Sequence, residues 1–334
     1  MLASSAAADA ATFGIGAAVS LGASALLASR IERLGARIGI SEALLGMLAA
    51  LGADSPEITS SITALRSGQH AIGIGVVLGS NVFNLAALLG VGALAAGRIA
   101  LHRRVIALEG TVAMWIVGTA LLVAAHVVPA AAGLVLALAA LLPYLVLIGF
   151  RRSTLERIRF PRRPLAWLEE SVHEEELELE PFPPVGGRPR VDILLTVGAV
   201  LVVIAASVMM ERAGAAIGTR YQLPTIVTGG VILAAVTSLP NAVAAVYLAR
   251  RGRGAAVLSE AMNSNALNVV VGLLLSGAII GLGGLGNSAL EVGAWYGGLT
   301  AGCLVLAYWL RGLNRLAGTA IVVAYAIFLV VLVA

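Results

Sequence analysis

The sequence has few charged residues and few aromatic residues. Only 12% of its 334 residues are charged and 59% are hydrophobic, with a mean hydropathy of +0.97. A water-soluble domain carries roughly a quarter of its residues as charged ones. A soluble protein is therefore excluded, and at roughly 20 apolar residues per crossing the length allows about ten to twelve membrane-spanning helices.

Other absences exclude further classes. The formal net charge is +4, but aromatic residues make up only 5% of the chain and the arginines do not gather in one domain, so nucleic-acid binding is not expected. Cys303 is the single cysteine, which rules out an intrachain disulfide. The chain has no Walker-type GxxxxGK[ST] motif, so nothing indicates an ATP-driven protein.

Apolar runs between charged or Gly/Pro breaks predict an all-α membrane protein with ten transmembrane helices. With the N-terminus outside, every arginine except Arg66, Arg212 and Arg220 falls in an inner connection. The positive-inside rule therefore places both termini outside. The predicted spans are 11–29, 40–65, 71–97, 105–125, 130–150, 191–210, 224–249, 255–283, 289–310 and 314–334.

The longest connection divides the chain into two halves. Residues 151–190 begin basic, continue through a glutamate-rich stretch and end in prolines and glycines, which is typical of a solvated linker; a short regulatory segment is the alternative. We expect a first five-helix unit at 1–150, a cytosolic linker at 151–190 and a second five-helix unit at 191–334.

The two halves contain copies of one segment. A gapless shift of 184 residues superposes 44–90 on 228–274 and matches, among others, Gly46 with Gly230, Pro56 with Pro240 and Asn81 with Asn265. The second copy begins five predicted spans after the start of the first, and this odd offset turns the second copy upside down in the membrane. Two inverted five-helix repeats are typical of secondary transporters, whose substrate site lies at mid-membrane between the repeats.

Two acidic residues lie within the first copy. The stretch ALGADSPEITSS places Asp54 and Glu57 three residues apart, on one helix face, beside Pro56. A charge in the membrane core costs a few kcal/mol even on lenient scales, so an ion or proton site is the default explanation. The alternative, that both acids lie at a span end in the interface, fits the central proline less well.

The second copy offers neutral oxygen atoms at the matching positions. AAVTSLPNAVAA supplies Thr237, Ser238 and Asn241 around Pro240. The following helix of each copy carries a serine and an asparagine four residues apart, which face one way: Ser80 with Asn84, and Ser264 with Asn268. One such pair alone is more often helix-packing contact than a ligand set, but its presence in both copies favours ligands.

The donors in these motifs are oxygen atoms only. Carboxylates, hydroxyls, amide oxygens and carbonyls freed near the two prolines suit hard cations, whereas the lack of His and Cys disfavours zinc, copper and iron. Calcium takes six to eight oxygen ligands, and two carboxylates would neutralise its charge.

These motifs resemble the sodium/calcium exchangers of the cation/calcium antiporter superfamily, prokaryotic type. The resemblance rests on GADSPE at 52–57 with LGSNVFN at 78–84, and on TSLPN at 237–241 with NSNALN at 263–268. The family pattern is approximately GTSLPE followed by GSNIFN or GSNIFD, occurring twice, and the ten-span plan with a central cytosolic loop matches the whole chain.

The resemblance implies a set of cation ligands. Glu57 falls on a principal coordinating carboxylate, Asn84 and Asn268 on amide or acid positions, and the remaining positions on hydroxyl or backbone-carbonyl ligands. This second group comprises Ser80, Thr237, Ser238, Ser264, Ala50 and Ala234.

The sequence departs from the family pattern at several of these positions. Asp54 replaces a serine, Ala53 replaces a threonine, and Asn241 stands where the second copy usually has an acid. Glu260 occupies a usual asparagine position on the face of Ser264, and its alternative role is that of a helix-start acid in the cytosol. We therefore expect the acidic charge to be concentrated in one repeat.

The sequence thus predicts a secondary-active cation antiporter, not an enzyme, that exports calcium in exchange for sodium. A calcium/proton or other divalent-cation antiporter is the alternative, an intramembrane acid hydrolase using Asp54 and Glu57 is a remote one, and a purely structural scaffold would leave the two acids unexplained. We expect no cofactor, inorganic cations and the bilayer as partners, and a prokaryotic plasma membrane as location. A monomer is one option that the sequence leaves open. Glu109 and Trp295 are expected to be interfacial anchors rather than ligands.

Overall fold

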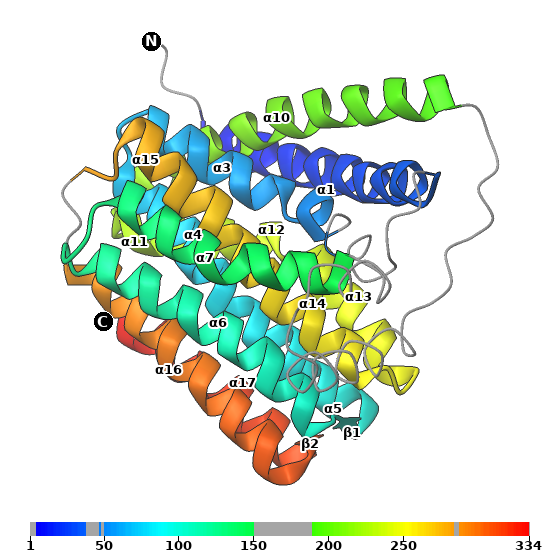
Figure 1. Cartoon of the computed structure of the whole chain (residues 1–334). Helices are drawn as coiled ribbons and strands as arrows, with labels where there is room; N and C mark the ends of the chain where they lie inside the picture. Colours follow the sequence, from blue (N-terminus) through cyan, green and yellow to red (C-terminus); the bar gives the residue numbers. More distant parts are fainter. Residues whose placement is uncertain (1–4, 38–46, 48–49, 150–188, 284–286, 334) are drawn as a thin grey trace.

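The computed structural model is a helical bundle with one small two-stranded sheet, and it describes residues 5–37, 47, 50–149, 189–283 and 287–333 (Figure 1). The helices of the first half are α1 (Ala6–Arg37), α3 (Ser55–Arg66), α4 (His70–Asn84), α5 (Gly92–Ala96), α6 (Arg103–Ala124) and α7 (Ala130–Gly149). Those of the second half are α10 (Pro189–Arg220), α11 (Thr225–Val227), α12 (Ala234–Thr237), α13 (Leu239–Arg250), α14 (Gly254–Leu267), α15 (Ser276–Ile280), α16 (Asn287–Leu310) and α17 (Arg315–Val333).

Seven stretches of helix in the described part of the chain are long and apolar enough to cross a membrane. An eighth is bent by 49° between 225–237 and 241–250, and 130–146 is a shorter apolar helix. The first part of the predicted span 40–65, including Gly46, lies outside the described residues. The linker 151–190 also lies outside them, except for residues 189 and 190. These long apolar helices make the chain an integral membrane protein.

The helix is interrupted at equivalent places in the two copies. Asp54 precedes α3 with φ −77° and ψ −5°, and Ser238 precedes α13 with φ −86° and ψ −1°. In each case a proline follows within the first turn, where its missing N–H is tolerated, although it cannot continue the hydrogen bonds of the preceding helix. The prolines therefore place a helix start beside the polar residues of both motifs.

Three π-helical segments widen the central helices. They are η1 (Leu85–Val91) between α4 and α5, η2 (Thr228–Leu233) between α11 and α12, and η3 (Asn268–Leu275) between α14 and α15. Such wide turns are often found at functional sites. Here η1 follows Asn84 directly and η3 starts at Asn268, so both begin at the matching asparagine of the two copies.

Close backbone contact holds α4 against η2 in the middle of the bundle. A Cβ atom at Gly79 would overlap the backbone of Gly230, and one at Gly75 would lie 2.9 Å from the Gly230 nitrogen. Only glycine permits two helical segments to approach so closely. The α4–η1–α5 stretch is almost completely buried as a result.

Helices α1 and α10 pack along each other at one side of the bundle (Figure 1). Asp192 pairs with Arg30 at 3.0 Å and with Arg37 at 2.7 Å at one end, and Asp9 pairs with Arg220 at 3.1 Å at the other. The strands β1 (Arg98–Ala100) and β2 (Gly312–Asn314) pair antiparallel, with Ile99 opposite Leu313, and join the ends of α5 and α17.

Candidate cation site

Asp54 is fully buried and faces side chains of the second copy. Its Oδ1 atom accepts hydrogen bonds from Asn241 Nδ2 at 2.6 Å and from Ser264 Oγ at 2.8 Å. Asn241 Nδ2 also lies 3.3 Å from Ser264 Oγ, so the two partners contact each other. Asp54 is thereby tied to α13 and α14, which are far from it in sequence.

Glu57 is also fully buried, one turn further along α3. Its Oε1 atom accepts a hydrogen bond from Ser238 Oγ at 2.5 Å, and its Oε2 atom accepts one from Asn268 Nδ2. Ser80 lies beside the same carboxylate, although its hydroxyl donates to the carbonyl of Val77 at 3.0 Å. Glu57 is therefore surrounded by residues of both motifs.

Four asparagines link α4 to α14 and the start of η3 by matched pairs of bonds. Asn81 and Asn265 each donate from Nδ2 to the other's backbone carbonyl, at 3.1 Å in both directions. Asn84 donates to Asn265 Oδ1 at 3.1 Å, and Asn268 donates to Asn81 Oδ1 at 3.2 Å. Each bond maps onto its counterpart when the residues are exchanged with those 184 positions away.

The site contains negative charge and oxygen atoms that no donor satisfies. Asp54 Oδ2, Asn84 Oδ1 and Asn268 Oδ1 are buried and accept no hydrogen bond from the described residues. Neither carboxylate forms an ion pair with any residue that the structure describes. Because buried charge without compensation is costly, this arrangement is chemically suited to a cation with hard oxygen ligands.

Four predicted ligands do not join this hydrogen-bonded group. The carbonyls of Ala50 and Ala234 accept helical hydrogen bonds from Asp54 N at 2.8 Å and Ser238 N at 3.1 Å. Thr237 Oγ1 donates to its own helix, to Ala234 O at 3.1 Å. Glu260 is half-buried, its Oε2 has no hydrogen-bond partner, and its charge is near enough to interact with that of Asp54.

The expectation that Pro56 frees a carbonyl is corrected in detail. The carbonyl left without a helical donor is that of Gly52, and Ser55 Oγ donates to it at 2.6 Å. The serine beside the proline replaces the missing N–H, so this oxygen is already hydrogen-bonded.

A second buried polar cluster was not anticipated from the sequence. Glu109 on α6 is 1% exposed, and its Oε1 atom accepts hydrogen bonds from Tyr144 at 2.6 Å and from Ser259 at 3.3 Å. Asn263 on α14 bridges Tyr144 and Ser259. The prediction of Glu109 as an interfacial anchor is therefore wrong: α7 and α14 cover it, and only the tertiary structure brings these partners to one place.

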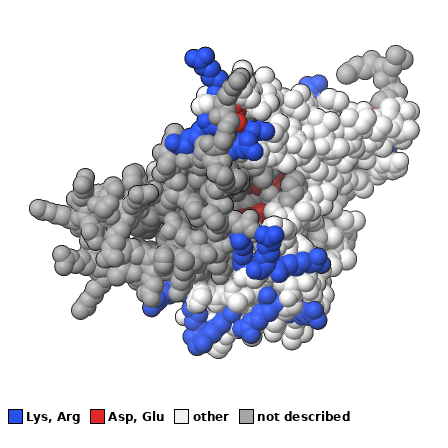
Figure 2. Space-filling view, turned by 90° about the vertical axis from the view of Figure 1, so that its right-hand side faces the viewer, with Lys and Arg blue, Asp and Glu red and all other residues white. Residues whose placement is uncertain are grey.

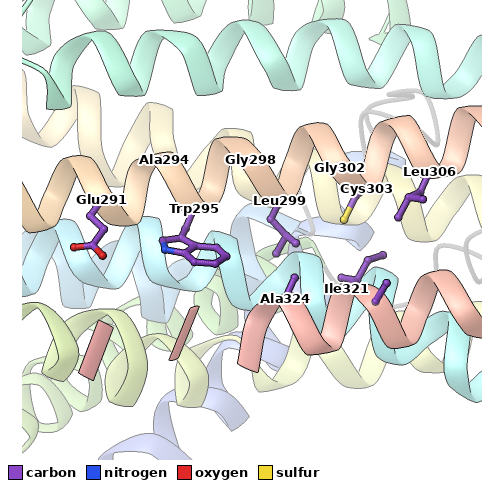
Figure 3. Close-up of a pocket in the computed structure, with 11 residues that line it drawn as sticks. Glu291, Ala294, Trp295, Gly298, Leu299, Gly302, Cys303, Leu306, Ile321 and Ala324 are labelled. Carbon is purple, nitrogen blue, oxygen red and sulfur yellow. The ribbon is translucent and has the colours of Figure 1, made fainter. Parts of the chain in front are cut away.

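A groove between α16 and α17 lies away from the carboxylates (Figure 3). Its lining is apolar apart from Glu291 at one end, and Trp295 projects into it from α16. Neither Asp54 nor Glu57 lines it, and an apolar lining offers no cation ligands. We therefore assign the candidate site to the buried polar group and not to this groove.

Solved structures with the same fold include two cation exchangers. The H+/Ca2+ exchanger CAX matches with a TM-score of 0.70 and 11% identity, covering 96% of this chain and 82% of that one. YfkE matches with 0.61 and 15%, covering 96% and 91%. The sodium–calcium exchanger NCX_Mj, soaked with Na+ and Sr2+, matches with 0.57 and 18%, covering 97% and 98%.

Sequence comparison gives the family. No curated protein sequence matches the chain. The family model described as "Sodium/calcium exchanger protein" matches residues 9–152 and 192–334, which is most of the chain and includes all the residues of the candidate site. The chain belongs to the sodium/calcium exchanger family and is a transporter rather than an enzyme.

Proposed function

We propose that the protein is a secondary-active antiporter that exports calcium in exchange for sodium at a site centred on Asp54 and Glu57. The observation that carries this proposal is the placement of two buried carboxylates, without ion pairs among the described residues, against amides and hydroxyls of the second copy. A divalent cation would neutralise both carboxylates and find hard oxygen ligands around them.

The proposed ligands differ in how directly the geometry supports them. Asp54 and Glu57 supply the charge, and the orphaned Oδ1 atoms of Asn84 and Asn268 supply neutral ligands. Four further residues contact the carboxylates and would turn their own hydroxyl or amide oxygens towards a bound cation: Ser80, Ser238, Asn241 and Ser264. Thr237, Ala50 and Ala234 would have to release helical hydrogen bonds first.

Glu260 is proposed as an additional carboxylate. It lies one turn before Ser264 on α14, and its unpartnered Oε2 atom and its interaction with Asp54 favour a place on the path to the site. With Glu260 the site would have three carboxylates and could bind more monovalent cations than with Asp54 and Glu57 alone.

The proposed architecture is ten transmembrane helices in two inverted repeats. The units are 1–150 and 191–334, with their motifs at 44–90 and 228–274, and they are joined by a cytosolic linker at 151–190. The reciprocal bonds of Asn81 with Asn265 support a pseudo-two-fold relation between the motifs. Repeats of this kind place the substrate site between them at mid-membrane.

The proposed orientation has both termini outside a prokaryotic plasma membrane. Figure 2 views the end of the molecule where α10 begins and where β1 and β2 lie, and arginine side chains gather there around visible acidic ones. Positive charge near the span ends favours the cytosolic side. The calcium would therefore leave the cytosol through this end.

Exchange follows from the cost of occluding charge. Two carboxylates enclosed without a cation are unfavourable in a low dielectric, so the protein would change its accessible side mainly when it is loaded. Calcium, sodium ions or protons can each satisfy the carboxylates, but they cannot all do so at once. Their competition couples the two fluxes, and the gradient supplies the energy without ATP or a cofactor.

Calcium/proton exchange is the second candidate. It is favoured by the replacement of family acids with Asn241 and Asn268, because a site with two carboxylates is neutralised as well by two protons as by one calcium ion. The two candidates differ only in the driving ion, so a flux measurement separates them.

The test is uptake of radioactive calcium into proteoliposomes under an imposed sodium gradient, an imposed proton gradient or neither. We expect the sodium gradient to drive uptake and Glu57→Gln to abolish it. Glu291→Gln, at the exposed end of α16, is the matched control and should leave uptake unchanged. Uptake that follows the proton gradient alone selects the second candidate. Uptake that ignores both gradients and tolerates Glu57→Gln contradicts the antiporter.

A further inference from the structure

Glu211 is a buried acid outside the cation site. It lies on α10, one turn beyond Ser207, whose hydroxyl contacts that of Ser20 on α1 at 2.9 Å. A Cβ at Gly214, almost one turn further on, would touch Phe13 of α1 and Leu233 of η2. This face of α10 is thus pressed between α1 and the bundle, and we call the contact of α10 with α1, α3 and η2 the α10 seam.

Glu211 has no hydrogen-bond partner among the side chains of this seam that the structure describes. Its side chain is 0% exposed, and neither Oε1 nor Oε2 has a hydrogen-bond partner among the described residues. At 1.5 Å per residue it lies about 13 Å along α10 from Arg220, well inside the helix. Burying an ionised, unpaired carboxylate at such a place costs far more than burying a neutral carboxylic acid.

The charged groups around the seam do not compensate it. Arg212 is the neighbouring cation whose charge acts on Glu211, but it is exposed and forms no ion pair with it in the described part of the chain. On α1, Asp9 pairs with Arg220, while Arg30 and Arg37 pair with Asp192 at the far end of α10. Of the other ionisable groups whose side chains the structure describes, Arg33 of α1 and Arg66 of α3 are exposed, and Glu57 of α3 is bonded in the cation site. The segments α11 and η2 carry none.

We propose that Glu211 is a proton-binding site in the α10 seam, separate from the cation site, and that it carries its proton while the seam is closed. A single carboxyl group suits a proton better than a metal ion, because a metal ion needs several oxygen ligands. The hydroxyl of Ser207, one turn earlier on α10, bonds to that of Ser20. The ligand is thus a proton, bound by one Oε atom.

The proton links the seam to pH. Helices α1 and α10 are held together near both ends by ion pairs, and within the seam α10 also contacts α3 and η2 of the bundle. If water enters the seam, Glu211 becomes hydrated and releases its proton more readily. Rising pH therefore favours the open seam, and falling pH favours the closed one.

The binding test needs no transport activity. Infrared spectra of purified full-length protein across a pH series report the carbonyl stretch of protonated carboxyl groups. We expect the wild-type protein to show a component that is lost in Glu211→Gln and retained in Glu291→Gln, the matched exposed control. Saturating calcium should leave this component in place, because it acts at Asp54 and Glu57 instead.

Two results would overturn the proposal. One is the absence of any protonated-carboxyl difference between the wild-type protein and a folded Glu211→Gln, with Glu211→Leu as a second variant that removes the group. The other is loss of the component at constant pH when sodium replaces choline, which would make Glu211 a metal ligand. Both readouts hold even if the proposed calcium–sodium exchange is wrong.

The effect on transport, which rests on the proposed function, is measured separately. Calcium uptake by the wild-type protein should have a pH-dependent step that Glu211→Gln lacks, while both proteins respond equally to loss of the sodium gradient. An identical pH profile for the two would contradict the link between Glu211 and the seam. Absence of uptake in both proteins at every pH contradicts the antiporter and leaves the infrared result to decide the proton site.

Discussion

The two copies of the motif divide the work of the site unequally. At the start of α3 the first copy supplies Asp54 and Glu57, whereas at the start of α13 the second copy supplies the neutral Ser238 and Asn241. Asp54 accepts hydrogen bonds from Asn241 and Ser264, and Glu57 accepts them from Ser238 and Asn268. One copy therefore supplies the charge and the other supplies the groups that hold it.

The same asymmetry appears on the helices that follow. Gly75 and Gly79 of α4 permit backbone contact with Gly230, while Ser259 and Asn263, their counterparts 184 residues later, bond to the Glu109 cluster. The same repeated helix is thus packed by close backbone contact in the first copy and by side-chain hydrogen bonds in the second. The comparison yields four predictions, given in decreasing order of expected effect.

Removing charge from the first copy should have the largest effect. Glu57→Gln removes a buried carboxylate that the proposed cation needs, and it should lower calcium binding by at least about a hundredfold, as expected for a buried charge that loses its partner. Ser238→Ala removes only a neutral donor to the same group and should cost about tenfold. Calcium titration of the purified variants measures both; equal losses would contradict the division of roles.

Moving the charge to the second copy should restore binding. Asp54→Asn alone should weaken calcium binding by about 10–100-fold, since a charged acceptor is lost. Adding Asn241→Asp returns a carboxylate to the opposite side of the 2.6 Å contact, and the double variant should recover most of the affinity. The double-mutant cycle fails to support the pairing if the two losses simply add.

Closing the space between α4 and η2 should destabilise the first copy. The methyl group of Gly79→Ala would overlap the Gly230 backbone, and overpacking costs about 1–3 kcal/mol or more. Gly118→Ala on α6 meets nothing within 4 Å and is the matched control. Thermal unfolding in detergent, monitored by the loss of monodispersity, should distinguish the two variants. An unfolding temperature of Gly79→Ala equal to that of the wild-type protein would contradict the close packing.

Loosening the polar cluster around Glu109, which Ser259 and Asn263 of the second copy join, should have the smallest effect on calcium binding. Tyr144→Phe keeps the ring and removes the 2.6 Å bond to Glu109, which should lower stability by about 1.5–3 kcal/mol while calcium affinity changes little. Tyr308→Phe, at an exposed position on α16, serves as the control. A large loss of calcium affinity in Tyr144→Phe would mean that the cluster belongs to the cation site.

Much of the candidate site could be predicted from residue types and spacing. Asp54, Glu57, Asn241 and Ser264 are polar groups in apolar runs, and their cost in a membrane marks them without any structure. Their pairing could not be predicted, because it depends on how α3, α13 and α14 rotate against one another. Glu109 was misread for the same reason: its burial depends on Tyr144 and α14, which spacing along α6 does not reveal.

The sequence by itself determined the membrane class, the duplicated motif and an inventory of hard oxygen donors. These follow from hydropathy, charge cost and self-similarity, which are properties of the chain read in order. Only the tertiary structure decided that Asp54 faces Ser264, that four asparagines exchange bonds across the copies, and that Glu211 is enclosed without a hydrogen-bond partner among the described residues. The hydrogen bonds join residues separated by 180 or more positions, and only packing of the helices brings these residues within bonding distance. Glu211 loses its contact with water only because neighbouring helices cover it.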